Sequence, residues 1–257
     1  MIDQPEQMLL VDRFANDLRR RIEGGDYGTS GVIPSMSELA EMWGTKNRAL
    51  VAEVIMLLRV QGYLTPTPKR RYRVVHPRLT LEGLTANFMQ HLESLGYAGE
   101  EEDIEEPRVE PMPLDIARMF IRNDTKQPAI KEGVHVIHRM RRQGIADLPL
   151  RIGHIWYPLD IAEPYLEAMK KDSRFDVPAA LKRDRGIAIA EEDFTLLSRV
   201  PDLAEMKELR LARYQPLLEV RRICYSLNHE QVVTLHRTIM DGTRFEYRFS
   251  RAVSHWQ

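Results

Sequence analysis

Apolar residues in the first sixty positions recur every three or four residues, which is the period of an amphipathic helix. The first series consists of Leu10, Phe14, Leu18 and Ile22. Gly24-Gly25 follows this series and predicts the end of a helix. A second helix is predicted to begin at Ser35, because Ser35 and Glu38 have the spacing of a capping box. Its apolar edge is formed by Leu39, Met42 and Trp43.

Gly44 separates the second helix from a third, for which Thr45 is the predicted N-cap. The apolar face of this third helix is formed by Leu50, Val51, Val54, Ile55, Leu57 and Leu58. Gly62 predicts its end, because glycine adopts the left-handed conformation that follows many helices. When two helices are joined by a tight turn, the first residues of the second helix stay exposed and can enter the major groove of DNA.

Positive charge is concentrated in the third helix and in the segment after it. The cations are Lys46, Arg48, Arg59, Lys69, Arg70, Arg71, Arg73 and Arg78, and Glu53 is the only acid among residues 46–78. Residues 63–64 and 71–75 flank a turn at 65–68, which predicts a β-hairpin with a basic tip and a basic returning strand. The net charge of −1 does not oppose binding to a polyanion, because binding depends on the local field.

Three helices followed by a basic hairpin predict a winged helix-turn-helix domain, whose partner would be a double-stranded DNA operator. A small helical bundle with a solvated basic loop is the alternative interpretation. In the first interpretation, DNA contacts come from the starts of the second and third helices and from the hairpin. The predicted DNA-binding residues are Ser35, Thr45, Lys46, Asn47, Arg48, Lys69, Arg70, Arg71 and Arg73.

The rest of the chain alternates between helical and strand-like patterns. Residues 77–82 are a predicted linker, because Pro77 disfavours helix around it. A helix is predicted through Leu84, Phe88, Leu92 and Leu95, and a short one around Ile116. The acidic run at residues 100–110 is predicted to be a solvated loop on composition.

Segments rich in valine, isoleucine and aromatic residues predict strands in the second half. They lie at 133–142, 150–157, 217–226, 231–240 and 244–250, and a further helix is predicted at 202–212. Mixed helices and hairpin-linked strands predict an α+β fold built on an antiparallel sheet. The expected organisation is a DNA-binding domain at 1–76, the linker at 77–82 and a second domain at 83–257.

Two predicted strands carry an arginine on the apolar face. Arg222 shares its face with Val220 and Cys224, and Arg237 shares its face with Val233 and Leu235. A buried cation needs an acidic partner or a bound anion. The sequence leaves both possibilities open for each arginine: an internal ion pair, or a negatively charged ligand.

Composition limits the class of protein. Apolar residues make up 43% and charged residues 29% of the 257 residues, which is typical of a soluble folded chain. Cys224 is the only cysteine, so the chain can form no internal disulfide. No apolar run approaches the roughly 20 residues that span a bilayer, and the acidic N-terminus lacks the basic start of a secretory signal. A cytoplasmic protein with no membrane partner is expected.

No residue pattern predicts catalysis or metal binding. His135 and His138 would point to opposite faces of a strand, so they do not predict a metal site. His154 is either a packed histidine or a ligand-binding one. A glycine-rich phosphate loop and the usual nucleophile–histidine motifs do not occur. We therefore predict no catalytic residue, no metal and no cofactor.

Residues 8–75 resemble the DNA-binding domain of GntR-family transcription regulators. The matching features include Pro34-Ser35, Glu38-Leu39-Ala40, Gly44 and Gly62. The resemblance implies a winged helix-turn-helix fold and operator binding. The recognition-helix start Lys46-Asn47 differs from the usual Ser-Arg of the family, so the operator sequence is not implied.

Residues 83–250 resemble the UTRA effector-binding domain of the HutC subfamily, which shares its fold with chorismate lyase. The features that carry the resemblance include residues 114–117, 137–141, 157–158, 216–222 and 241–245. In sugar-phosphate-responsive relatives an R-x-R pair lines the effector site, and Arg139 and Arg141 match that pair. The effector-binding residues expected in this chain are Arg139, Arg141, His154, Arg222 and Tyr247.

The two resemblances imply a homodimeric regulator, expected to be a repressor, that releases or binds DNA in response to a small molecule. An anionic effector is one candidate class. The alternative function is a chorismate-lyase-like enzyme domain with an appended nucleic-acid-binding module.

Overall fold

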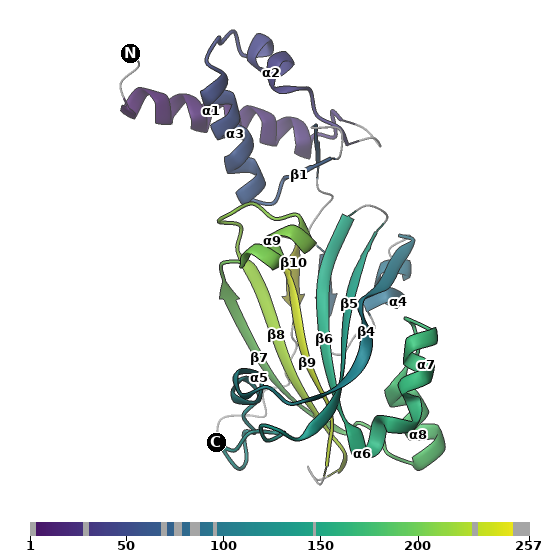
Figure 1. The fold of residues 1–257 in the computed structure, drawn as a ribbon. Helices are drawn as coiled ribbons and strands as arrows, with labels where there is room; N and C mark the ends of the chain where they lie inside the picture. Colours follow the sequence, from purple (N-terminus) through teal and green to yellow (C-terminus); the bar gives the residue numbers. More distant parts are fainter. Residues whose placement is uncertain are drawn as a thin grey trace, which may run out of the picture. The chain divides into compact units, whose positions relative to one another are not determined.

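The computed structural model describes residues 4–27, 31–67, 71–74, 79–82, 88–94, 97–145, 148–227 and 231–248. The chain divides into two compact units, and Figure 1 shows the elements of each. The first unit comprises Met1–Thr80, Val200–Leu217 and Asp241–Glu246. The second comprises Leu81–Arg199, Leu218–Met240 and Tyr247–Gln257.

The first unit contains the three helices that apolar periodicity predicts. They are α1 (Gln4–Glu23), α2 (Met36–Met42) and α3 (Arg48–Val60). Their core includes Leu18, Leu39, Leu50, Val54 and Leu58, all buried. The ring of Trp43 stacks on Phe14 at 4.7 Å between centroids, and its indole nitrogen donates to Asp17 at 3.1 Å. This contact fixes the end of α2 against α1, and α3 packs on the same core.

The ends of these helices follow local chemistry. The predicted capping box at α2 is confirmed: Ser35 N donates to Glu38 Oε2 at 2.6 Å, and Glu38 N donates to Ser35 Oγ at 3.3 Å. The predicted N-cap of α3 was wrong by two residues. Asn47 caps this helix by accepting from Leu50 N at 3.2 Å, while Thr45 Oγ1 accepts from Asn47 N at 3.1 Å. Gly62 has a φ of 80°, as its predicted role at the helix end requires.

The predicted hairpin after α3 is present. Strand β1 (Leu64–Pro66) pairs antiparallel with β2 (Tyr72–Val74), and Leu64 is opposite Val74. Val32, which lies before α2, adds an isolated antiparallel bridge to Arg73. Three helices and this hairpin form a winged helix-turn-helix.

The second half of the chain is built around a six-stranded sheet with the order β4-β5-β6-β9-β8-β7. The strands are β4 (Gly99–Pro111), β5 (His135–Ile145), β6 (Leu148–Pro158), β7 (Glu191–Arg199), β8 (Leu217–Tyr225) and β9 (Val232–Asp241). The pairs β4–β5, β5–β6 and β6–β9 are antiparallel. Two short strands, β3 (Leu79–Glu82) and β10 (Phe245–Arg248), pair with each other.

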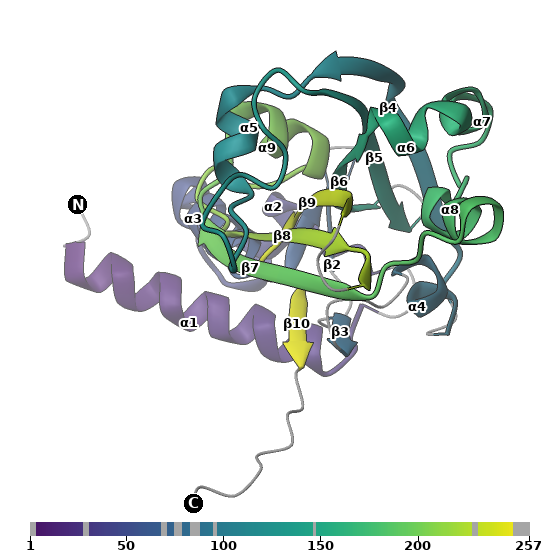
Figure 2. The ribbon, with the colours of Figure 1, turned by 90° about the horizontal axis from the view of Figure 1, so that it is seen from below.

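Helices cover both faces of the six-stranded sheet. On one face, Ile137, Ile155 and Tyr157 pack against a helical segment that follows β6. This segment contains α6 (Leu159–Ala162), a 3-10 turn (Glu163–Tyr165), α7 (Leu166–Lys171) and α8 (Val177–Arg185). Figures 1 and 2 show these helices beside β4, β5 and β6. On the other face, Val136 and Trp156 pack against α5 (Leu114–Met119).

Two further helices complete the described fold. Helix α4 (Phe88–Ser94) falls within the predicted helix at 84–95 and buries Phe88 and Leu92. Helix α9 (Leu203–Leu209) begins with a capping box between Asp202 and Glu205. It buries Leu209, whereas Leu203 is 84% exposed.

The prediction of a solvated loop at residues 100–110 was wrong, because this run forms most of β4. Its acids face cations on β5 in the antiparallel register: Glu102 is opposite Arg142 and Asp103 is opposite Arg141. Side chains then pair Glu101 with Arg141, Glu102 with Arg142 and Asp103 with Arg139. Opposite charges across a ladder stabilise a strand that its composition alone disfavours.

The Asp103–Arg139 pair generates a stability prediction. Arg139 is fully buried, and Asp103 is its only carboxylate partner among the ion pairs of the described residues. Asp103→Ala should therefore lower the free energy of unfolding by about 3–5 kcal/mol, because it leaves a buried charge without a counter-ion. Urea unfolding monitored by circular dichroism measures the change.

Glu102→Ala is the matched control for this substitution. It removes the neighbouring acid on β4, whose side chain is 61% exposed and pairs with Arg142. A cost below about 1 kcal/mol is expected for such an exposed pair. Equal costs for the two substitutions would contradict a structural role for Asp103.

Candidate functional site

The predicted nucleic-acid surface of the first unit includes the start of α3. Lys46 and Arg48 are exposed, whereas Thr45 and Asn47 are half-buried. The oxygens of Thr45 and Asn47 both accept hydrogen bonds from backbone N–H groups at the helix start. The cations at this helix start are therefore free to meet a ligand, while Asn47 also holds the helix N-terminus in place.

The hairpin carries the second part of this surface. Arg71 and Arg73 are exposed, and Arg59 lies over the ring of Tyr72 at 5.8 Å from the centroid. Ser35 is half-buried, and its hydroxyl serves the capping box of α2. Lys69 and Arg70 lie outside the described residues, so their predicted contacts stay predictions.

A cavity of about 490 Å³ lies in the second unit, on the sheet face that also carries α7 and α8. Its floor is formed by side chains of β5, β6, β8 and β9. Its sides are formed by α4, by residues 174–178 and by Tyr247 of β10. The volume is in the range of small-molecule sites. The lining residues that carry chemistry are Glu93, Glu101, Arg141, Gln143, Arg151, Arg174, Asp176, Arg222, His236 and Tyr247.

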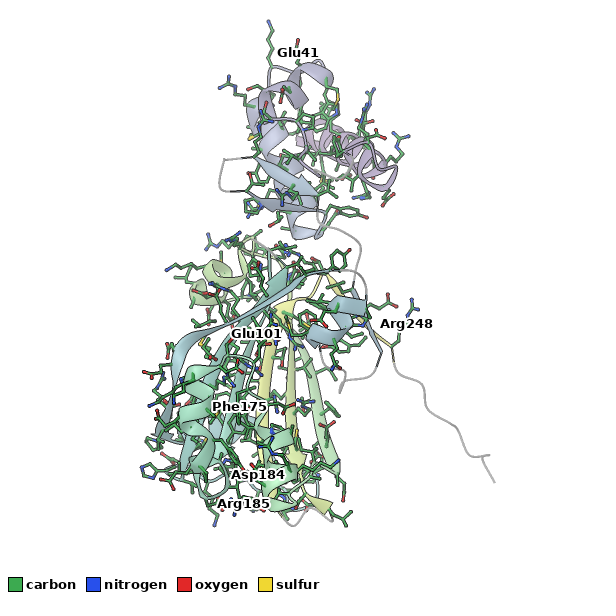
Figure 3. All side chains as sticks on the ribbon, turned by 90° about the vertical axis from the view of Figure 1, so that its right-hand side faces the viewer. Glu41, Glu101, Phe175, Asp184, Arg185 and Arg248 are labelled. Carbon is green, nitrogen blue, oxygen red and sulfur yellow. The ribbon has the colours of Figure 1, made fainter. Side chains whose placement is uncertain are left out.

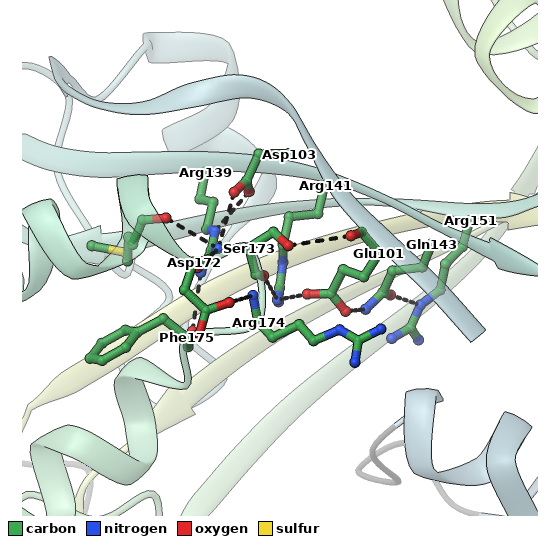
Figure 4. Close-up of polar contacts among 11 residues, drawn as sticks. Glu101, Asp103, Arg139, Arg141, Gln143, Arg151, Asp172, Ser173, Arg174 and Phe175 are labelled. Carbon is green, nitrogen blue, oxygen red and sulfur yellow. Dashed lines mark hydrogen bonds and ion pairs between the residues drawn. The ribbon is translucent and has the colours of Figure 1, made fainter. Parts of the chain in front are cut away.

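Four of these lining residues form one chain of hydrogen bonds, which Figure 4 shows. Arg141 pairs with one carboxylate oxygen of Glu101, and Gln143 donates to the other. The amide oxygen of Gln143 accepts from Arg151 Nε. The carboxylate of Glu101 thus binds both the guanidinium of Arg141 and the amide of Gln143. Within the part of the chain that the structure describes, Arg151 donates only to the neutral amide of Gln143.

The remaining polar groups of the cavity come from the other strands. Burial and the nearby Arg222, Arg141 and Arg151 lower the pKa of His236 well below its usual value, so its ring is neutral at pH 7. His236 Nε2 lies 2.7 Å from Thr234 Oγ1. Burial raises the pKa of Tyr247, against the effect of Arg151 and Arg222, so its hydroxyl stays protonated. Arg222 lies 3.4 Å from Glu192.

The structure brings together Arg141, Arg222 and Tyr247 among the predicted effector residues, but places Arg139 elsewhere. Arg139 pairs with Asp103 at 2.8 Å. It also donates to the backbone oxygens of Phe175 at 3.1 Å and Asp172 at 2.8 Å. Arg139 does not line the cavity, and its donors are directed to the protein itself (Figure 4). The expectation that it binds the effector is therefore corrected to a structural role.

His154 also lies away from the cavity. Its ring stacks with those of His138 and Trp156, at centroid distances of 5.4 and 5.7 Å. His138 in turn lies 3.0 Å from Glu110. In the register of the sheet, His154 follows Gly153, which faces the cavity, so its side chain points to the opposite face. Of its two interpretations, the packed histidine describes this geometry.

The two arginines that the sequence left open have different surroundings. Arg222 lines the cavity, whereas Arg237 donates to Glu219 Oε2 at 3.1 Å. Glu219 is fully buried and also accepts from Arg199 and Arg221, each at 2.7 Å. Arg237 therefore belongs to an internal ion-pair network, whereas Arg222 both lines the cavity and pairs with Glu192.

Sequence reasoning missed Arg151, Glu101 and His236 as cavity residues. Arg151 and His236 lie on predicted strands, and alternation could have placed them on the face of Arg141. Glu101 could not be found in this way, because its segment was interpreted as a loop. No group of three or more metal-ligating side chains occurs among the described residues. None of the described helices is long and apolar enough to cross a membrane.

Comparisons with known proteins agree with this fold. Residues 122–246 match the UTRA domain family. PhnF from Mycobacterium smegmatis aligns at 16% identity with a TM-score of 0.59, over 94% of this chain and all of that one. The effector domain of PhnF alone gives a TM-score of 0.55 at 15% identity, over 68% of this chain and 99% of that one.

A third solved structure, of a protein assigned to the GntR family of transcriptional regulators, gives a TM-score of 0.54 at 16% identity. It covers 95% of this chain and 98% of that one. No curated protein matches the sequence. The fold is therefore α+β, with an N-terminal winged helix-turn-helix and a C-terminal UTRA domain.

The Glu219 network generates a prediction about acid sensitivity. Burial alone would raise the pKa of Glu219, but hydrogen bonds from Arg237, Arg221 and Arg199 outweigh it and lower the pKa to about 2. A carboxyl whose folded pKa is depressed stabilises the fold above its unfolded pKa and loses that contribution as pH falls toward the folded value. The loss for Glu219 should be about 2 kcal/mol between pH 6 and pH 3.

Urea unfolding of the wild type and of Glu219→Gln at several pH values tests this prediction. The variant should be less stable at pH 7, and its stability should fall less steeply below pH 4.5, because the titrating group is gone. Glu102→Gln removes an exposed carboxyl and should keep the wild-type slope. The same slope in Glu219→Gln and the wild type would contradict the assignment.

Proposed function

We propose that this chain is a cytoplasmic transcription regulator of the GntR family, HutC subfamily, that acts as a repressor. Its winged helix-turn-helix binds an operator in double-stranded DNA, and its UTRA domain binds a small-molecule effector in the cavity. The observation that carries the proposal is the presence, in one chain, of exposed cations at the start of α3 and on β2 and of a ligand-sized cavity in the UTRA region.

The effector regulates by binding rather than by being converted. A ligand changes operator affinity only if it binds two arrangements of the protein with different affinities. The solved relatives support this kind of function, because one is assigned to a family of transcriptional regulators and another contains a part named an effector domain.

We expect some residues on α3 and β2 to contact the DNA backbone and others to contact the bases. Arg71 and Arg73 on the hairpin should contact phosphates, and Arg48 at the helix start should contact base edges. Arg71→Ala should weaken binding to all sequences and lower the salt slope by about 0.9 for the lost phosphate contact. Arg48→Ala should change which bases are selected.

In vitro selection from a random duplex library, followed by fluorescence anisotropy at several salt concentrations, measures both effects. Asn47→Ser is a useful companion variant, because serine keeps the helix cap and removes the amide. If Arg71→Ala and Arg48→Ala alter selection and salt slope in the same way, this division is wrong. If the wild type selects no sequence at all, the proposed function is wrong.

A homodimer on the operator is the second prediction of this function. One winged helix reads few base pairs, and two copies gain specificity by reading two half-sites. Light scattering of the full chain should give twice the 29.9 kDa of one copy. Binding to the selected operator should collapse when its half-sites are moved apart by about half a helical turn, or about 5 base pairs. A monomer that tolerates the shifted spacing would contradict the prediction.

A further inference from the structure

Four cations and three acids line the cavity: Arg141, Arg151, Arg174 and Arg222, with Glu93, Glu101 and Asp176. Glu101 offsets Arg141, because both lie in one ion pair whose second carboxylate oxygen is used by Gln143. Arg222 has Glu192 at 3.4 Å. Arg151 differs from both, since its one hydrogen-bond partner among the described residues is the amide oxygen of Gln143. Arg151 therefore lines the cavity without a carboxylate bound to it among the described residues.

The surroundings of Arg151 hold its guanidinium in place without neutralising it. Its Cζ lies 3.9 Å from the centroid of the Phe88 ring, and Nε is bound to Gln143. A guanidinium that is stacked and bonded through Nε keeps four N–H donors on its terminal nitrogens for a planar anion. A partly buried cation of this kind is costly unless a counter-ion binds.

Arg222 and Tyr247 line the same cavity as Arg151. Burial lowers the pKa of Arg151 to about 9, and Tyr247, Arg141, Glu101 and Arg222 all act on it. Arg151 and Arg222 likewise both act on the pKa of Tyr247. A carboxylate or phosphate binds to cations and hydroxyl donors. The cavity offers Arg151, which has no bound carboxylate from the described residues, together with Arg222 and the protonated hydroxyl of Tyr247.

We infer that the effector carries a carboxylate or phosphate group, and that Arg151 is the residue that binds this group and selects for it, with Arg222 and Tyr247 as further contacts. The inference rests on the proposed use of the cavity as the effector site. It moves the anion away from the R-x-R pair, because Arg139 is bound to Asp103 and Arg141 is bound to Glu101.

Thermal unfolding and calorimetry of the full-length protein test this role. Inorganic phosphate and malonate serve as separate probes of the phosphate and carboxylate forms, at an ionic strength held constant with sodium chloride. At least one probe should raise the melting temperature of the wild type, because a ligand that binds only the folded state stabilises it. The probe with the lower dissociation constant identifies the form of the anion.

Arg151→Gln should weaken binding of that probe about 10- to 100-fold, which is typical for loss of a charge-assisted contact. Arg151→Lys keeps the charge but loses the planar fork, so it should bind with intermediate affinity. Arg142→Gln is the matched control, because it removes the same charge from the neighbouring strand, where the side chain pairs with exposed Glu102. This control should bind the probe like the wild type.

Two results would overturn the assignment. One is a wild type that neither anion stabilises. The other is an Arg151→Gln protein that melts at a lower temperature without ligand yet binds the probe as the wild type does, which would make Arg151 a structural residue. Because anion binding is measured without DNA, it is independent of operator selection. A protein that binds the anion but selects no DNA would contradict the proposed regulator while leaving the role of Arg151 intact.

Discussion

The pairing of the acidic strand β4 with the basic strand β5 is the interaction on which the second unit depends. Asp103 neutralises Arg139, and Arg139 in turn holds the backbone oxygens of Asp172 and Phe175. These carbonyls lie in the segment between α7 and α8, which continues into one wall of the cavity at residues 174–178. Figure 3 shows Glu101 and Phe175, which both line the cavity, in the same unit. A cross-strand ion pair thus positions a wall that is distant in sequence.

The same pairing decides which arginine can meet a ligand. A guanidinium within reach of a buried carboxylate binds that carboxylate first, because the internal partner is already in place and costs no further ordering. Arg139 and Arg141 are both held in this way by β4. Arg151 on β6 is one strand further from the acids, and Gln143 transmits a hydrogen bond to it but no charge. The acids of β4 bind the arginines of β5 but not Arg151 on β6. In the described parts of the chain, Arg151 is therefore left as a cavity cation without a bound carboxylate.

This dependence also explains what the sequence could predict. Most signals that act within a few residues were reliable: the capping box at Ser35 and Glu38, the glycine after α3 and the hairpin of the winged helix-turn-helix. The N-cap of α3 was the exception, at Asn47 rather than Thr45. Signals that need a distant partner were not. The acidic run became a strand because β5 supplies its cations, and Arg139 became structural because Asp103 lies 36 positions away. Helices α6, α7 and α8, which are four, six and nine residues long, were not predicted from the sequence.

Strand β10 follows β9 after a short turn and pairs with β3, not with β9. His236 and Thr238 on β9 and Tyr247 on β10 line the cavity. The turn between these strands contains Asp241 and Arg244, a buried pair at 2.7 Å. The backbone oxygen of Arg244 accepts from Leu79 N at 2.7 Å, and Leu79 is the first residue of β3, within the linker predicted from the sequence. Separating a buried ion pair is costly, because leaving either charge without its partner costs several kcal/mol. The turn after β9 is therefore held by a buried pair, and its backbone in turn holds the first residue of β3.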